Sequence, residues 1–230
     1  MKIKFSKKFT TFLIVVTCIL LVLIIKILTA GSRGDLSQIQ SGRVKGNPQT
    51  PVKIVEFIDF QCPSCAHGSK ILKKFMAENP MTIQLELKYY PLNMHRHAFL
   101  SAYYAECAAH QGRFWSFEDL LIERQDQWSK LYDAKPYFDI LAKDVGLNSG
   151  QLNACLKDPK VESTILAERE EGKKLGVQST PTYFIIELPS NKQNSKILSK
   201  SFRVEKEKLN NGEMMVGVSL LQEKLNTFKQ

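Results

Sequence analysis

Two cysteines separated by two residues form the segment Cys62-Pro63-Ser64-Cys65, directly after the apolar run 52–60. Their sulfur atoms can close a disulfide ring only where the backbone bends, and a strand that leads straight into a helix provides that bend. The first sulfur then lies at the helix N-terminus, where unpaired N–H groups and the helix dipole favour a thiolate over a thiol. The motif therefore predicts thiol–disulfide exchange.

A zinc site is the main alternative, because a lone Cys-x-x-Cys pair is also half of a tetrahedral zinc site. Zinc needs a second closely spaced pair or two suitably spaced histidines. The remaining cysteines and the histidines do not have this spacing: Cys18, Cys107 and Cys155, and His67, His95, His97 and His110. We therefore favour redox chemistry and expect no metal and no cofactor other than the Cys62–Cys65 disulfide.

Residues 1–30 have the composition of a targeting segment. Four lysines precede an apolar stretch that runs from Phe9 to Ile25. Basic residues before an apolar run keep the N-terminus inside and send the rest of the chain across the membrane. The length of the stretch is compatible with a cleaved signal peptide and with a membrane anchor, so both remain open. In either case residues 31–230 are expected outside the cytoplasm.

Export changes how the cysteines are interpreted, because disulfides persist outside the cytoplasm. The four cysteines beyond the leader are then expected to form two bonds. Local geometry assigns Cys62 to Cys65, which leaves Cys107 and Cys155 as a structural disulfide. That bond would stabilise the fold by roughly 4 kcal/mol on the chain-entropy model. The alternative for this second pair is two buried apolar thiols.

The net charge of +9 is not a sign of nucleic-acid binding. Five of the 32 Lys and Arg lie in the first 30 residues, which hold no acidic residue, so the remainder carries about +4. No basic run is interleaved with aromatic residues, and we expect no nucleic-acid partner.

Residues 31–50 are polar and glycine-rich and predict a flexible linker. Residues 51–230 are long enough for one domain with a full core.

The order of elements predicts an α/β core with a helical insertion. A buried strand over 52–57 leads into a helix over 62–76, and an alternating strand over 82–90 is expected to lie parallel to the first. A helical block follows at about 97–175. The C-terminal part is expected to contain a strand, a basic loop, a second strand and a closing helix, over 182–187, 188–212, 214–218 and 219–228.

The segments Val-Glu-Phe-Ile-Asp-Phe-Gln-Cys-Pro-Ser-Cys, Glu106–Trp115 and Gly-Val-Gln-Ser-Thr-Pro-Thr-Tyr-Phe carry a family resemblance. Over roughly residues 50–228 the chain resembles the DsbA-like branch of the thioredoxin superfamily, whose members are periplasmic or membrane-tethered. The resemblance implies a thioredoxin-like fold with a helical insertion between a βαβ unit and a C-terminal ββα unit. It also implies a protein-disulfide oxidoreductase.

The resemblance assigns a role to each site residue. Cys62 matches the exposed nucleophile and Cys65 the buried resolving thiol. Pro181 matches the cis proline of the superfamily, which leaves the backbone of Thr180 free to pair with an extended substrate. Glu56 matches a buried acid that relays a proton to Cys65. The alternative interpretation of Glu56 is an acidic residue at a strand end that pairs with a nearby lysine.

Two residues depart from the strongest oxidants of the group. Ser64 occupies the third position of the motif, where those proteins carry histidine, and it offers a hydroxyl but no positive charge. Asp59, three residues before Cys62, would disfavour the thiolate if its side chain pointed toward it. Both residues leave the strength of the oxidant open.

The resemblance implies a dithiol oxidase that introduces disulfides into reduced exported proteins in the periplasm. Its expected partners are those clients and a DsbB-like, quinone-linked membrane protein that reoxidises it. Contact with the inner membrane is expected if residues 1–30 are uncleaved, and the chain is expected to act as a monomer. The alternatives are an isomerase or reductase, a metal carrier using Cys62, Cys65 and His67, and a peptide-binding module.

Overall fold

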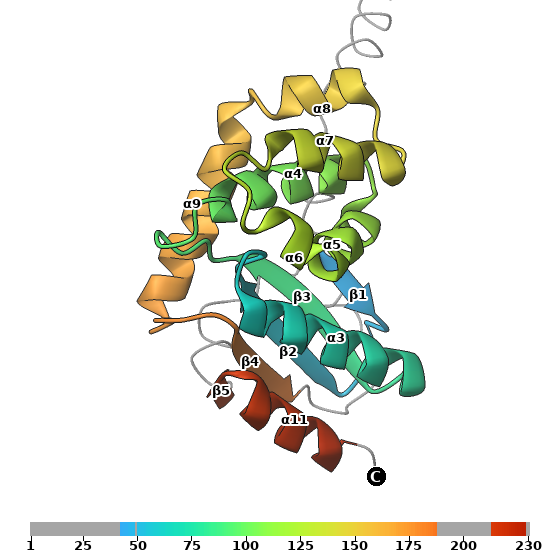
Figure 1. The fold of residues 1–230 in the computed structure, drawn as a ribbon. Helices are drawn as coiled ribbons and strands as arrows, with labels where there is room; N and C mark the ends of the chain where they lie inside the picture. Colours follow the sequence, from blue (N-terminus) through green and yellow to red (C-terminus); the bar gives the residue numbers. More distant parts are fainter. Residues whose placement is uncertain (1–41, 49, 188–212, 229–230) are drawn as a thin grey trace, which may run out of the picture. The chain divides into compact units, whose positions relative to one another are not determined.

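The computed structural model of the protein describes residues 42–48, 50–187 and 213–228 (Figure 1). The predicted signal peptide or anchor over 1–30 and the predicted basic loop over 188–212 lie outside these residues. Within the described part of the chain, no helix is long and apolar enough to cross a membrane.

A five-stranded mixed sheet forms the centre of the fold, in the order β1-β3-β2-β4-β5. The central strand β2 (Val52–Ile58) runs parallel to β3 (Ile83–Tyr89) and antiparallel to β4 (Thr182–Glu187). The edge strands β1 (Val44–Gly46) and β5 (Glu213–Val216) pair antiparallel with β3 and β4. The β2–β3 pair is parallel because helix α3 connects the two strands as a crossover.

Helices α3 (Pro63–Glu78) and α11 (Val218–Thr227) pack against each other beside the sheet (Figure 1). The six helices of the insertion extend from the β3 end of the sheet: α4 (Ala98–His110), α5 (Phe114–Glu123), α6 (Gln125–Trp128), α7 (Lys135–Asp144), α8 (Ser149–Cys155) and α9 (Pro159–Lys174). Proline at the first position of α3 suits a helix start, since the amide that it lacks would have no partner there. Asn79 ends the helix by donating its backbone N–H to the carbonyl of Phe75.

The central strand is buried on both faces, which is why its sequence is almost continuously apolar. Ile54 and Ile58 face the larger core, which the strand shares with α3 and the insertion. Val55 and Phe57 face a smaller core on the other side of the sheet. Glu56 alternates with Val55 and Phe57, so its carboxylate lies on the larger-core side, among apolar side chains.

The predicted α/β architecture with its helical insertion is confirmed, and most predicted elements differ from the observed ones by one to three residues. The main difference concerns the linker over 31–50, because residues 44–46 of that segment form β1, paired antiparallel with β3. Three residues with one glycine give no recognisable strand pattern. The segment is held by a tertiary contact that its own composition does not reveal.

That contact centres on Arg43, which is 2% exposed. Its guanidinium donates two hydrogen bonds to the carboxylate of Glu168 on α9, at 2.7 and 2.8 Å, and lies 4.5 Å from the ring centre of Tyr89 on β3. Glu168 also accepts the backbone N–H of Tyr89, and the Tyr89 hydroxyl donates to Glu106 on α4. A buried charge is costly unless it is paired, and here each charge has several partners. This network ties β1 and two insertion helices to β3.

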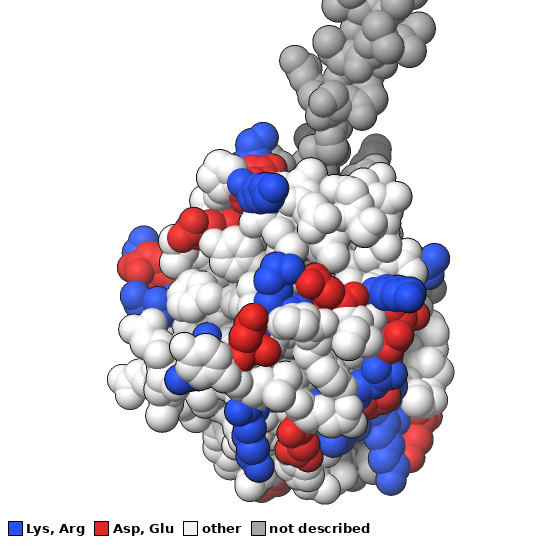
Figure 2. Space-filling view, turned by 45° about the horizontal axis from the view of Figure 1, so that its top comes forward, with Lys and Arg blue, Asp and Glu red and all other residues white. Residues whose placement is uncertain are grey.

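The surface shows no single-sign field on the face seen in Figure 2, where Lys and Arg side chains lie next to Asp and Glu side chains. Ion pairs between partly exposed side chains, such as Lys135–Asp139 and Arg124–Asp144, also bring opposite charges together. A nucleic-acid interface would instead gather its positive charges on one face.

A disulfide between Cys107 on α4 and Cys155 on α8 closes a loop of 48 residues within the insertion. We predict that the double variant Cys107→Ala/Cys155→Ala loses about 4 kcal/mol of unfolding free energy, because the unfolded chain regains its loop entropy. Urea unfolding followed by circular dichroism measures this difference. A loss below about 1 kcal/mol would show that the bond contributes little to the stability of the insertion.

Candidate active site

The two cysteines of the motif lie where β2 passes into α3. Cys62 has an extended backbone and forms the N-cap of the helix. Its backbone N–H donates to the carbonyl of Asp59 at 3.0 Å, which bends the chain between strand and helix. Cys65 lies one turn inside the helix and is fully buried, whereas Cys62 is 7% exposed. Both are thiols in this structure.

A second loop meets the motif from the far end of the sequence. The Thr180–Pro181 peptide bond is cis, and the Thr180 carbonyl oxygen lies 3.4 Å from Cys62 Sγ, although the two residues are 118 positions apart. The sheet brings them together. Because β4 is antiparallel to β2 and Thr182 pairs with Phe57, the start of β4 lies beside the end of β2.

Hydrogen bonds lower the pKa of Cys62 to about 5, from an ordinary value of 9.0. The largest contribution is the hydrogen bond from the Cys65 thiol. The backbone N–H groups of Cys65 and Ser64 and the side chain of Thr180 act in the same direction, and burial opposes them. Donors that point at a sulfur stabilise its anion. At neutral pH Cys62 is therefore a thiolate.

Cys65 has the opposite character. Burial raises its pKa well above the ordinary value, and its hydrogen bond to Cys62 and the negative charges of Cys62 and Glu56 add to that rise. One thiol of the pair is thus held charged and the other neutral. This difference suits an exchange reaction in which Cys62 receives and releases the incoming sulfur, while Cys65 takes up and gives back a proton.

The carboxylate of Asp59 is occupied by its own donors. It accepts the backbone N–H groups of Gln61 and Leu92, and His95 Nδ1 lies 2.7 Å from its second oxygen. Three donors around one fully buried carboxylate compensate its charge. The sequence predicted that Asp59 would disfavour the thiolate if its side chain pointed toward Cys62. In the structure its carboxylate is instead directed to Gln61, Leu92 and His95, where it anchors the loops around the motif.

Two glutamines connect the motif to the insertion, and the sequence analysis did not single them out. Gln125 on α6 donates its side-chain amide to the carbonyls of Phe60 and Cys62, at 2.7 and 3.1 Å. Gln61 donates to the carbonyl of Ser129 and accepts the backbone N–H of His97. A side-chain amide leaves no periodic signal in a sequence, so only the fold identifies these contacts.

Glu56 lies beneath the motif, opposite Tyr183 of β4. It is fully buried, and within the described part of the chain neither of its carboxylate oxygens has a hydrogen-bond partner of normal geometry. Burial raises the pKa of Glu56 well above 4.5; the negative charges of Glu118 and Cys62 add to the rise, and Tyr183 opposes it. Burial therefore favours the protonated form of the Glu56 carboxyl group.

The predicted site residues Cys62, Cys65, Glu56, Thr180 and Pro181 thus gather at one end of β2, and Cys107 and Cys155 lie apart in the insertion. Among the residues that the structure describes, no three His, Cys, Asp or Glu side chains are grouped so that they could hold a metal ion. His67 is exposed.

The low pKa of Cys62 predicts how the reduced protein reacts with iodoacetamide. Only the thiolate is alkylated, so the rate at Cys62 should rise through a midpoint near pH 5 and stay level from about pH 6 to 8. An ordinary thiol would show its midpoint near pH 8.5. Rapid quenching followed by mass spectrometry of the Cys62 peptide measures the profile.

A Cys65→Ala variant provides the comparison, because it removes the strongest donor to the Cys62 sulfur. Its midpoint should move toward higher pH. A wild-type midpoint near pH 8.5 would contradict the hydrogen-bonded thiolate.

Three comparisons bear on this arrangement. The sequence model of a family described as Thioredoxin matches residues 38–200. A curated relative, Na⁺/H⁺ antiporter NhaA 3 of Salinispora tropica, is 29% identical over 143 residues, which are 62% of this chain and 21% of the relative. The chain therefore spans about a fifth of the length of that relative.

Solved structures show the same fold. Wolbachia pipientis alpha-DsbA1 has a TM-score of 0.61 and 19% identity, with 81% of this chain and 89% of that chain covered. Oxidised BdbD from Bacillus subtilis has a TM-score of 0.56 and 22% identity, with 75% and 95% covered. At these identities the likeness establishes the fold.

Proposed function

Because this chain belongs to the thioredoxin family, we propose that it is a thiol–disulfide oxidoreductase that introduces disulfides into exported proteins through Cys62 and Cys65. The single observation that carries the proposal is the geometry of the two thiols at the β2–α3 junction: Cys62 caps the helix 3.4 Å from the Thr180 carbonyl oxygen, and Cys65 is fully buried one turn further on. The fold, shared with the solved structures of DsbA-type proteins, supports it.

The reaction transfers two electrons from a client dithiol to the enzyme disulfide. A client thiolate attacks the Cys62 sulfur, the Cys62–Cys65 bond breaks, and Cys65 leaves with the electron pair and takes up a proton. The second client thiolate then attacks the client sulfur of the mixed disulfide. A client disulfide forms and Cys62 leaves as a thiolate, which its low pKa favours.

The direction of the reaction rests on the same thiolate. Donors that stabilise the Cys62 anion stabilise the reduced enzyme, and a stable reduced form makes the disulfide a stronger oxidant. This supports oxidation over the isomerase or reductase alternative. The Thr180 carbonyl, 3.4 Å from the sulfur, is the backbone group beside which an extended client segment would lie. Pro181 would hold that loop in place by the cis bond that precedes it.

Clients and reoxidant follow from the chemistry. The enzyme leaves each cycle reduced, so it needs an electron acceptor, for which we propose a DsbB-like, quinone-linked membrane protein. The basic and apolar leader supports a periplasmic location, with attachment to the inner membrane if the leader is retained. The antiporter name belongs to the relative alone, because the match covers 21% of that protein.

We predict that the oxidised full-length protein, in detergent, accelerates disulfide formation in reduced ribonuclease and that Cys62→Ser abolishes the acceleration. Serine has no sulfur, so the variant can form neither the disulfide with Cys65 nor the mixed disulfide with a client. A free-thiol assay and the recovery of ribonuclease activity follow the reaction. Cys18→Ser is the matched control and should retain the wild-type rate. Wild-type rates in Cys62→Ser would rule out the assignment.

The two active-site cysteines should also differ in trapping. A Cys65→Ala protein keeps its nucleophile and loses the intramolecular thiol that releases a mixed disulfide, so it should accumulate client complexes through Cys62. Cys62→Ala should trap far less, because Cys65 is fully buried. Non-reducing gels of exported proteins compare the two. Equal trapping would instead favour a metal carrier, in which each cysteine is an equivalent ligand.

A further inference from the structure

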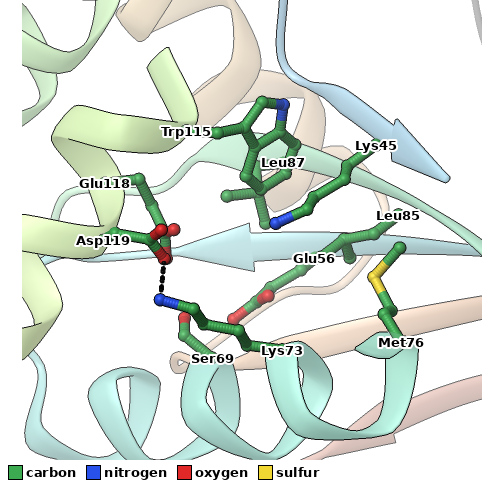
Figure 3. Close-up of a pocket in the computed structure, with 10 residues that line it drawn as sticks. All are labelled: Lys45, Glu56, Ser69, Lys73, Met76, Leu85, Leu87, Trp115, Glu118 and Asp119. Carbon is green, nitrogen blue, oxygen red and sulfur yellow. Dashed lines mark ion pairs between the residues drawn. The ribbon is translucent and has the colours of Figure 1, made fainter. Parts of the chain in front are cut away.

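A small cavity lies on the inner side of α3, between that helix, the sheet and α5 (Figure 3). Its volume is about 20 Å³, enough for one water molecule. Glu56 of β2, Ser69 of α3 and Glu118 of α5 point toward this space from three different elements. The insertion thus places a second carboxyl group next to the buried acid of the active site.

The polar atoms in this cavity lack the partners that buried polar atoms normally have. Within the described residues, both oxygens of Glu56 and the hydroxyl of Ser69 are buried without a hydrogen-bond partner of normal geometry. Glu118 is 6% exposed. A water molecule needs two to four polar partners, and these three side chains provide them. A polar, water-sized space between two acids is a short path for a proton.

The outer end of the cavity is solvated. Lys73 and Asp119 line it and form an ion pair at 2.8 Å, with side-chain exposures of 49% and 31% (Figure 3). Glu118 lines the same cavity and is 6% exposed, so it is the buried carboxyl group next to this partly exposed pair. Glu56 itself has no contact with solvent, because it is fully buried.

We propose that Glu118 is a positioning residue for the active site, which exchanges a proton with Glu56 across this cavity and so connects the buried acid to solvent. The proposal rests on the proposed function, since it explains how Cys65 acquires its proton. It adds to the Cys62–Cys65 pair a residue from the helical insertion.

The charges around Glu118 fit this role. Burial raises its pKa to about 7 and Asp119 on the same helix adds to the rise, whereas Lys45 of β1 and Lys73 and Ser69 of α3 oppose it. A group whose pKa lies near the ambient pH gives and takes protons with little cost in either direction. The negative charge of deprotonated Glu118 also raises the pKa of Glu56 and so favours its protonated form.

The proton steps balance without an added reactant. When the Cys62–Cys65 bond breaks, the Cys65 sulfur takes the electron pair and then the proton of the Glu56 carboxyl. The Glu56 carboxylate regains a proton from Glu118 through one water molecule, and Glu118 regains its own from solvent beside Lys73 and Asp119. Reoxidation of the enzyme reverses these steps and returns one proton to solvent.

Titration of the carboxyl groups in the oxidised full-length protein tests the coupling directly. Carbon-13 labelled glutamate reports each midpoint by NMR, and neither active-site cysteine titrates in this form because both are in the disulfide. In Glu118→Gln the midpoint of Glu56 should fall, with about a tenfold loss of proton affinity, because a neighbouring negative charge is gone. The matched control is Glu123→Gln, on the same helix and also paired with Lys73 but outside the cavity, and it should leave Glu56 unchanged.

The pH profile of disulfide reduction tests the relay. Dithiothreitol reduces the Cys62–Cys65 bond in a single turnover, and the rate is divided by the fraction of reductant thiolate at each pH. Glu118→Gln should approach the wild-type rate as the pH falls and protonates Glu56, and it should be about tenfold slower at pH 8. Glu123→Gln should follow wild type throughout. Ser69→Ala, which removes the hydroxyl between the acids, should also be slower only at alkaline pH.

The outcomes separate the two proposals. An unchanged Glu56 midpoint in Glu118→Gln, or an equal slowing at every pH, would overturn the role of Glu118, and Ser69→Ala decides the relay if Glu118→Gln fails to fold. If the wild-type protein does not oxidise ribonuclease, the proposed function fails. The Glu56 titration still tests the coupling in that case.

Discussion

The N-terminus of α3 holds the hydrogen-bond donors on which the active site depends. The Cys65 thiol and the backbone N–H groups of Cys65 and Ser64 converge on the Cys62 sulfur. They do so because β2 ends at Ile58 and the helix begins at Pro63, with Cys62 as its N-cap. The sheet register then brings Thr180 to the same sulfur. The negative charge of Cys62 is stabilised mainly by these hydrogen-bond donors.

Burial gives the inner side of the same site the opposite property. Cys65, Glu56 and Glu118 all have raised pKa values, and burial is the largest cause for each of them. The protonated forms are thus favoured on the inner side of the site, and the thiolate is favoured at the helix N-terminus. This separation requires a cover over the inner face of α3, and helix α5 of the insertion provides it. The insertion therefore contributes to the chemistry as well as to the size of the fold.

Polar contacts hold the helical insertion against the sheet, and some of them also contact the motif. Gln125 holds the carbonyls of the β2–α3 bend, and the Arg43–Glu168 pair holds the first strand and α9 against β3. The disulfide Cys107–Cys155 closes the outer helices. Each of these contacts joins segments that are distant in sequence. The geometry at Cys62 consequently depends on residues throughout the domain.

The sequence alone determined the elements and the reactive pair. A buried run rich in β-branched residues predicted β2, alternation of apolar residues predicted β3, and a helical pattern predicted the insertion, because these signals are local. The spacing of Cys62 and Cys65 at a strand–helix junction predicted the chemistry for the same reason. The tertiary structure decided the rest: that residues 44–46 form β1, that Asp59 turns to His95, and that Glu118 faces Glu56. Such contacts depend on how distant side chains pack and share buried charge, which no local pattern encodes.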